Sequence, residues 1–227
     1  MKTYALILSA GSSTRFGGTI KKQFYELKGK PVLYYSVNAF NKSKLIDEIV
    51  LVTAKEDIEA VKDLVKKYSF NKVKYVVEGG NTRQESVKNG LAKLEDGNVL
   101  IHDSARPLVD EEIISSLLKA LNSYDGVTPA LKSVDTIIKV ENNELSSLED
   151  RNLLYRLQTP QVFKVKTIKE AHQKFQGKNA TDDTQLVKLL GKKVCIIEGK
   201  EQLMKLTRLE DTNAIEAYIE KNEYLQN

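Results

Sequence analysis

Short apolar runs alternate with amphipathic stretches over the first 130 residues of the chain. Runs of strand length fall at residues 4–9, 49–53, 73–77 and 99–102. Between and after them, apolar residues recur at spacings of three and four, the period of a helix with one buried face, which predicts helices at 31–40, 58–68, 87–94 and 113–121. This alternation is typical of βαβ units. The predicted fold class is therefore α/β, with a Rossmann-like, mainly parallel sheet flanked by helices.

The rhythm changes after Gly126. Residues 134–140 alternate toward the turn-forming cluster Glu141-Asn142-Asn143, and strand-like residues resume at Leu145 and at 155–159. We interpret residues 134–158, approximately, as a protruding β-arm. A two-stranded arm buries too little surface to be stable alone, so the sequence predicts that it packs on a second copy of the chain in a homodimer.

The rest of the chain returns to the α/β pattern. We expect a helix after Lys164, another at 181–190, a strand at 194–198 and a terminal helix near 209–220. Cys195 lies in the apolar run of that strand, where a buried core thiol is the expectation. With no linker or repeat in the sequence, residues 1–227 are predicted to form a single domain.

The composition of the chain indicates which kinds of molecule it can bind. The chain has 227 residues, 41% hydrophobic and 29% charged, which is typical of a globular protein. Lys and Arg exceed Asp and Glu by 35 to 31 without a basic tract, which argues against nucleic-acid binding but suits a local pocket for a small polyanion. No apolar run approaches the roughly 20 residues of a membrane span, and the apolar start reads as a first strand. We therefore expect a cytoplasmic protein without a membrane partner.

The first strand ends in a loop of small residues, Ser9-Ala10-Gly11-Ser12-Ser13-Thr14-Arg15, followed by Lys21-Lys22-Gln23. Ligands of open parallel sheets bind beyond the carboxyl ends of the strands, and small residues let backbone amides approach phosphate oxygens. The loop lacks both the G-x-G-x-x-G of a dinucleotide fold and the G-K-[ST] of a P-loop. Arg15 and Lys22 can approach a triphosphate from two sides; the alternative is a solvated basic loop.

Two further strands end in similar segments. His102-Asp103-Ser104-Ala105-Arg106-Pro107 follows one of them, and a carboxylate there can hold a ribose hydroxyl or Mg²⁺, although Asp103 and Arg106 can equally form a salt-bridged turn. For His102 we favour a half-buried imidazole at the strand end over a catalytic role. Gly79-Gly80-Asn81-Thr82-Arg83 leads into a helix with free amides, or uses glycine only for its backbone freedom. Three such loops together favour a nucleotide site.

These segments resemble the sugar-phosphate cytidylyltransferases, most closely the 2-C-methyl-D-erythritol 4-phosphate cytidylyltransferases of the non-mevalonate isoprenoid pathway. The resemblance covers nearly the whole chain. Besides the three loops, it is carried by Asp135-Thr136-Ile137-Ile138-Lys139, Asp150-Arg151, Gln158-Thr159-Pro160-Gln161, Ala180-Thr181-Asp182-Asp183 and Lys205-Leu206-Thr207. Lys21 departs from the pattern, because the family usually has proline there.

The resemblance implies a role for each matched residue. Arg15 and Lys22 would be catalytic, holding the CTP phosphates and stabilising charge at the reacting phosphorus, and Mg²⁺ would assist them. The nucleotide side would consist of Ala10, Gly11, Ser12, Gly80, Ser86, Asp103 and Ser104. The sugar-phosphate side would consist of Arg106, Thr136, Arg151, Thr159, Thr181, Asp182 and Lys205, with residues 136 and 151 lent by the partner subunit's arm.

The implied reaction is CMP transfer from CTP to methylerythritol phosphate with release of pyrophosphate. The sugar phosphate supplies a charged nucleophile, so neither a histidine base nor a serine nucleophile is required. One alternative is a ribitol 5-phosphate cytidylyltransferase, although the segment Thr181-Asp182-Asp183-Thr184 favours the isoprenoid enzyme. The other is a non-catalytic CTP-binding module, against which Arg15, Lys22 and Lys205 speak.

Overall fold

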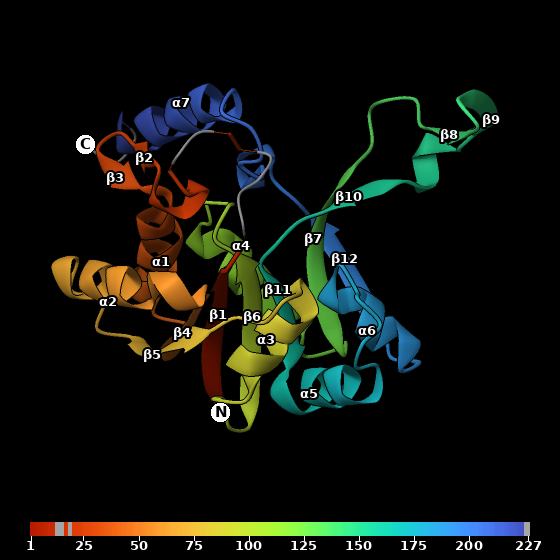
Figure 1. The fold of residues 1–227 in the computed structure, drawn as a ribbon. Coiled ribbons are helices and arrows are strands. Elements are labelled where there is room, and N and C mark those ends of the chain that lie inside the picture. The colour runs from red at the N-terminus through yellow and green to blue at the C-terminus, as the bar shows by residue number, and fades with distance from the viewer. Residues whose placement is uncertain (12–15, 18–19, 225–227) are drawn as a thin grey trace.

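The computed structural model describes residues 1–11, 16–17 and 20–224 and is built around one large twisted sheet (Figure 1). Its parallel part has the order β6-β1-β4-β5, and antiparallel β11 joins β6 to β7. Strand β12 pairs with β7 in the parallel sense, and β10 pairs with β7 in the antiparallel sense. The strands are β1 Lys2–Ser9, β4 Glu48–Thr53, β5 Val73–Glu78, β6 Gly97–Asp103, β7 Gly126–Lys132, β10 Tyr155–Leu157, β11 Gln161–Lys164 and β12 Val194–Glu198.

Helices cover both faces of this sheet because its central strands are apolar on both sides. In β1, Ala5 and Ile7 pack into the core layer beneath α1, α2 and α4, whereas Leu6 and Leu8 pack into the layer beneath α3, α5 and α6. Strands buried on both faces are characteristic of parallel α/β sheets. The helices are α1 Val32–Lys42, α2 Ile58–Lys67, α3 Arg83–Leu91, α4 Glu111–Ala120, α5 Val165–Lys174, α6 Asp183–Leu189 and α7 Asp211–Tyr224.

A third apolar cluster lies near the carboxyl ends of the strands. It joins Phe16 and Leu27 to Ile215 and Ile219 of α7, and Leu27 belongs to the short hairpin of β2 Glu26–Leu27 and β3 Lys30–Pro31. Short 3₁₀ helices flank the same region: η1 Lys22–Phe24, η2 Lys55–Asp57 and η4 Glu201–Leu203; η3 Arg151–Leu153 belongs to the arm.

The predicted α/β class is confirmed, and each predicted strand and helix has a counterpart. The prediction failed on β7 and β11, which the hydrophobic pattern did not identify. Strand β7 is buried from Gly126 to Ala130, so it shows no alternation, and its Pro129 argues against a strand in sequence. Cys195 is only half-buried, packing against the edge of the core, so the expected buried thiol is corrected to a partly covered one.

The predicted arm is present and extends away from the sheet (Figure 1). Strands β8 Ile138–Glu141 and β9 Glu144–Leu148 form its hairpin, and β8 begins four residues later than the predicted 134–140 run. Asn142 and Asn143 both adopt positive φ, as the turn of a tight hairpin requires. Large apolar side chains along the arm are exposed: Val134, Ile137, Ile138, Val140, Leu145, Leu148, Leu153, Tyr155 and Leu157. Within the described part of the chain, no helix has the length and apolarity to cross a bilayer.

Candidate active site

A cavity of about 420 Å³ opens at the carboxyl ends of β1 and β6. It is lined by three of the loops singled out in the sequence and by one segment from near the end of the chain. Its described lining residues are Leu8, Ser9, Ala10, Gly11, Phe16, Lys22, Gln23, Gly80, Asn81, Thr82, Arg83, Ser86, Asp103, Ser104, Ala105, Lys205 and Thr207. The expectation that these loops meet is therefore confirmed.

The loop after β1 contributes Ala10 and Gly11 to the cavity, and η1 contributes Lys22. Ser12 and Arg15 lie outside the described residues. Next to Lys22, the Lys21 Nζ contacts Asp57 Oδ1 and Oδ2 at 2.9 and 2.8 Å and Glu56 Oε1 at 2.7 Å. These ion pairs tie the beginning of η1 to η2, so Lys21 provides an anchor where the family pattern has proline.

The turn before α3 is shaped by its own side chains. The Gly80 N–H donates to Ser86 Oγ at 3.1 Å, and this hydroxyl donates to Thr82 O at 2.9 Å. Thr82 Oγ1 accepts from the Glu85 N–H, which caps the helix. A Cβ on Gly80 would lie 2.2 Å from Glu85 Cβ, so only glycine fits the close approach. Gly80 and Ser86 therefore present a compact polar wall to the cavity.

Asp103 is the only acidic residue among the described lining residues. Its Oδ1 accepts from Arg83 Nε at 3.3 Å, and its Oδ2 contacts Lys205 Nζ at 2.7 Å. Burial alone would raise the pKa of Asp103, but the charges of Arg83 and Lys205 outweigh it and hold this pKa well below its usual value. The carboxylate is ionised at neutral pH, so it can accept a hydrogen bond from a ribose hydroxyl or bind a cation.

His102 lies behind this carboxylate and is fully buried, which corrects the expected half-buried imidazole. Its ring packs against Phe40 at 5.3 Å between ring centres. Burial lowers the pKa of His102 to about 4. The neutral ring donates from Nε2 to Arg106 O at 2.9 Å, so Nδ1 accepts from Thr159 Oγ1 at 3.0 Å. His102 is thus part of the frame and does not line the cavity.

The residues assigned to the sugar-phosphate side are distributed over several places. Thr159 is buried, and besides contacting His102 it accepts the Asp103 N–H at 3.1 Å. Arg106 is held by the carbonyls of Leu203 and Leu157, at 2.5 and 3.3 Å, and its buried Nε has no hydrogen-bond partner among the described residues. Of the assigned set, only Lys205 lines the cavity itself.

The remaining members of that set lie on α6 and on the arm. Asp182 caps α6 through Thr184, accepts from Gln161 Nε2 at 2.7 Å and follows the exposed Thr181. Thr136 and Arg151 lie on the exposed arm, where the Arg151 Nη1 donates to Val134 O at 3.2 Å. The structure of one chain does not bring these two residues to the cavity.

Nine of the described lining residues had no role assigned from the sequence: Leu8, Ser9, Phe16, Gln23, Asn81, Thr82, Arg83, Ala105 and Thr207. Arg83 ends the segment Gly79-Gly80-Asn81-Thr82-Arg83, and its place after the Gly-Gly turn was a signal for a cavity residue. Its partners were not predictable, because its Nη1 contacts Asp183 Oδ2 at 2.6 Å across one hundred residues of sequence.

The described residues around the cavity offer few ligands for a metal ion. Among the described residues, no group of three or more His, Cys, Asp or Glu side chains is arranged to hold a metal. Mg²⁺ is commonly bound by one or two carboxylates together with substrate phosphates. Asp103, the one carboxylate among the described lining residues, would fit that arrangement, in which phosphates of a bound nucleotide would supply the other oxygens.

Comparisons with known proteins find relatives over nearly the whole chain. The family model for 2-C-methyl-D-erythritol 4-phosphate cytidylyltransferase matches residues 3–221. The chain is 41% identical over 223 residues to the 2-C-methyl-D-erythritol 4-phosphate cytidylyltransferase of Clostridium acetobutylicum, covering 96% of this chain and 97% of that protein.

Two solved structures share the fold. The 4-diphosphocytidyl-2C-methyl-D-erythritol synthase of Anaerococcus prevotii superposes with a TM-score of 0.84 at 31% identity, covering 96% of each chain. The 2-C-methyl-D-erythritol 4-phosphate cytidylyltransferase of Thermus thermophilus gives a TM-score of 0.79 at 27% identity, covering 95% of this chain and 98% of that one.

Proposed function

The chain belongs to the 2-C-methyl-D-erythritol 4-phosphate cytidylyltransferase family, and from this premise we propose that the cavity beyond β1 and β6 is where it transfers CMP from CTP to the sugar phosphate. The observation that carries the assignment is the meeting of Lys22, Asp103 and Lys205 around the small-residue loop and the Gly80 turn. This arrangement offers cations for phosphates and a carboxylate for a ribose or a metal ion.

The reaction requires positioning and charge neutralisation. A phosphate oxygen of the sugar phosphate attacks the α-phosphorus of CTP, a new phosphorus–oxygen bond forms, and the bond to the β-phosphate oxygen breaks to release pyrophosphate. Lys22 and Arg15 stabilise the negative charge that develops on the phosphates, as preorganised cations do at a developing oxyanion. Mg²⁺, when bound with CTP, supplies further neutralisation of the pyrophosphate leaving group.

The two substrates are assigned to two sides of the site. Ala10, Gly11, Ser12, Gly80, Ser86, Asp103 and Ser104 bind CTP in this proposal. Lys205 stands between the sides, because it contacts Asp103 and faces the cavity. The sugar phosphate is bound by Lys205 with Arg106, Thr181, Asp182 and the arm residues of a second subunit, while the buried Thr159 supports Asp103 from behind.

The proposed assembly is a homodimer joined through the β-arm. Strand β8 is exposed along its whole length, and large apolar side chains line the arm. A hairpin of this size is not stable in water by itself. A second subunit would cover these side chains and would receive Thr136 and Arg151 into its own site. Residues 1–227 act in this proposal as one nucleotidyltransferase domain; a cytoplasmic location stays a prediction.

Side-by-side assays test the proposed function. Purified protein with CTP and Mg²⁺ is offered methylerythritol 4-phosphate or ribitol 5-phosphate, and pyrophosphate release is followed. We expect release with the first substrate at least about 100-fold faster than with the second, because a misfitted polar substrate leaves buried partners unpaired. Equal rates would indicate a ribitol-type enzyme. CTP binding without pyrophosphate release from either sugar phosphate would indicate a non-catalytic module.

A further inference from the structure

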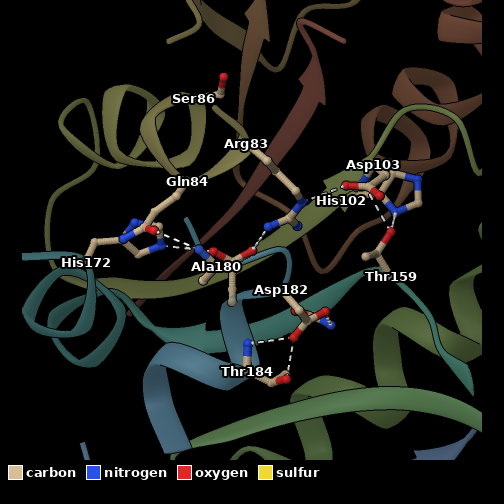
Figure 2. Close-up of polar contacts among 12 residues, drawn as sticks. Arg83, Gln84, Ser86, His102, Asp103, Thr159, His172, Ala180, Asp182 and Thr184 are labelled. Carbon is tan, nitrogen blue, oxygen red and sulfur yellow. Dashed lines mark hydrogen bonds and ion pairs between the residues drawn. The ribbon is translucent and has the colours of Figure 1, made fainter. Parts of the chain in front are cut away.

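We propose that Arg83 is a positioning residue that fixes the Asp103 carboxylate toward the nucleotide, and that Asp183 and His172 hold Arg83 in the orientation this requires. The inference rests on the proposed function, because it assigns a purpose to a part of the same site. It concerns residues to which the resemblance gave no role. Figure 2 shows Arg83 extending from α3 toward Asp103.

The guanidinium of Arg83 bridges two carboxylates from different elements. Arg83 is the first residue of α3, and its Nε lies 3.3 Å from Oδ1 of Asp103 at the end of β6. Its Nη1 lies 2.6 Å from Oδ2 of Asp183, the first residue of α6. A planar guanidinium presents donors in a fixed fork, so two separate carboxylates determine its orientation better than one. The side chain therefore links the nucleotide wall of the cavity to α6.

Asp183 is a buried carboxylate that contacts Arg83 through one oxygen and His172 through the other. It is 1% exposed, and its second oxygen, Oδ1, lies 2.9 Å from Nε2 of His172 on α5. Burial alone would raise the pKa of Asp183, but Arg83 and His172 outweigh it and keep this pKa below its usual value. An ionised carboxylate only accepts hydrogen bonds, so the proton of this contact lies on His172 Nε2. His172 is itself 2% exposed and has little freedom to rotate.

This arrangement determines how much positive charge Asp103 experiences. Lys205 approaches Asp103 Oδ2 at 2.7 Å, so Arg83 and Lys205 hold opposite oxygens of the same carboxylate. Because Arg83 shares its charge with Asp183, it orients Asp103 without neutralising it completely. If Arg83 were lost, Lys205 would be the one remaining cation contacting the Asp103 side chain among the described residues. The carboxylate would then turn toward Lys205 and away from the nucleotide.

A positioning role predicts an effect on one substrate more than on the other. Removing the Arg83 charge should raise the KM for CTP about tenfold, while the KM for the sugar phosphate changes less than about twofold. Arg83→Lys should give an intermediate KM, because an ammonium reaches one carboxylate where the guanidinium reaches two. A role limited to holding α3, β6 and α6 together would lower the melting temperature without separating the two KM values.

The experiment compares Arg83→Gln, Arg83→Lys, Asp183→Asn, His172→Gln and His172→Leu with the wild type. Steady-state pyrophosphate release gives both KM values, calorimetry with CTP and Mg²⁺ gives the nucleotide affinity, and thermal unfolding reports the fold. Lys62→Ala is the matched control, because it removes a cation from the exposed Lys62–Glu59 pair on α2. Its kinetics and CTP affinity should equal those of the wild type.

We expect Asp183→Asn to weaken CTP affinity about three- to tenfold, since it removes the charge that Arg83 shares. His172→Gln retains an N–H donor and should bind CTP more tightly than His172→Leu. Equal shifts in both KM values, or lower melting temperatures with unchanged CTP affinity, would overturn the inference. If Arg83→Gln does not fold, Arg83→Lys and Asp183→Asn decide by the same criteria. A wild type without pyrophosphate release would instead refute the proposed function, independently of these variants.

Discussion

The cavity end of the sheet and the β-arm carry the two parts of the proposed site, and they are built in opposite ways. At the cavity, β1, α3 and β6 bring small residues together, and Asp103 is held by cations on both oxygens. On the arm, β8 is exposed throughout, and Arg151 donates to a carbonyl of its own arm. One chain assembles the part proposed to bind the nucleotide, whereas the proposed function requires a second subunit for the side chains that the arm presents.

The largest expected effect tests the cavity as the catalytic part. Lys22→Ala should reduce turnover about 10²- to 10³-fold, by analogy with the loss of one oxyanion donor, because it removes a cavity cation that the proposed function places against the phosphates. Pyrophosphate release at saturating CTP and sugar phosphate measures it, and circular dichroism checks the fold. Lys55→Ala, at an exposed lysine of η2, is the control and should keep wild-type turnover. Wild-type turnover in Lys22→Ala would remove Lys22 from the mechanism.

The second effect is a pH dependence of the free energy of unfolding, which we expect from the buried His102 behind the cavity and not from the exposed arm. Unfolded histidine has a pKa near 6.5, whereas burial lowers the pKa of folded His102 to about 4. The unfolded state therefore binds more protons between these pH values, and the free energy of unfolding falls as the pH is lowered from about 6.5 to about 4. The expected loss attributable to His102 is about 3 kcal/mol.

Urea unfolding at a series of pH values measures this dependence. Asp103 raises the pKa of His102, whereas Arg106 and Lys205 lower it, so these facing charges partly offset one another. His102→Gln keeps a donor for Arg106 O but cannot titrate, and its stability should fall less steeply over the same range. An identical pH dependence in wild type and variant would show that His102 is not the responsible group.

Sequence alone predicted the cavity well where position along a strand determines it. Ala10 and Gly80 follow strands of the parallel sheet, Asp103 is the last residue of another, and the carboxyl ends of parallel strands meet at one edge. Lys205 came from the resemblance alone, because its contact with Asp103 depends on how the segment after β12 returns across the sheet. The Arg83–Asp183 contact was equally unpredictable, since it depends on how α3 and α6 pack.

The arm was predicted from alternation and the Asn-Asn turn, and its role in a homodimer was predicted as well and stays a prediction. The exposure of Val140, Leu145 and Leu148, which supports that prediction, became known only from the structure. At His102 the sequence-based prediction underestimated the burial of the side chain. A strand end suggests partial exposure, whereas Phe40, Thr159 and the Arg106 carbonyl together enclose this ring.

The third effect tests whether the arm completes a neighbouring site. Arg151→Ala should raise the KM for the sugar phosphate about 10- to 100-fold, the range expected from hydrogen bonds to a charged group, while CTP affinity stays nearly unchanged. Arg156→Ala is the matched control, because Arg156 forms an exposed ion pair with Glu201 and has no assigned substrate. It should change either KM less than about twofold.

Subunit mixing tests whether one site contains the cavity of one subunit and the arm of the other. If a site takes Lys22 from one subunit and Arg151 from the other, a mixed dimer of Lys22→Ala and Arg151→Ala subunits has one site with both lesions and one with neither. Activity should then partly return. Sites built within one chain predict no recovery, and its absence in mixed dimers confirmed by native mass spectrometry would contradict the shared site.

The smallest effect compares ion pairs of the two regions. Lys139 Nζ pairs with Glu149 Oε1 at 2.9 Å on the arm, where 67% of the Lys139 side chain is exposed. Lys21 pairs with Asp57 at 2.8 Å beside the cavity, and there the side chains are 33% and 10% exposed. Exposed pairs contribute roughly 0 to 1 kcal/mol because water and salt screen them. We therefore expect Lys139→Ala to change the free energy of unfolding by less than about 0.5 kcal/mol and Lys21→Ala by about 1 kcal/mol or more. Urea unfolding at low and high salt measures both; a larger loss in Lys139→Ala would mean that the dimer shields this pair, so the arm would be as enclosed in the assembly as the cavity is within one chain.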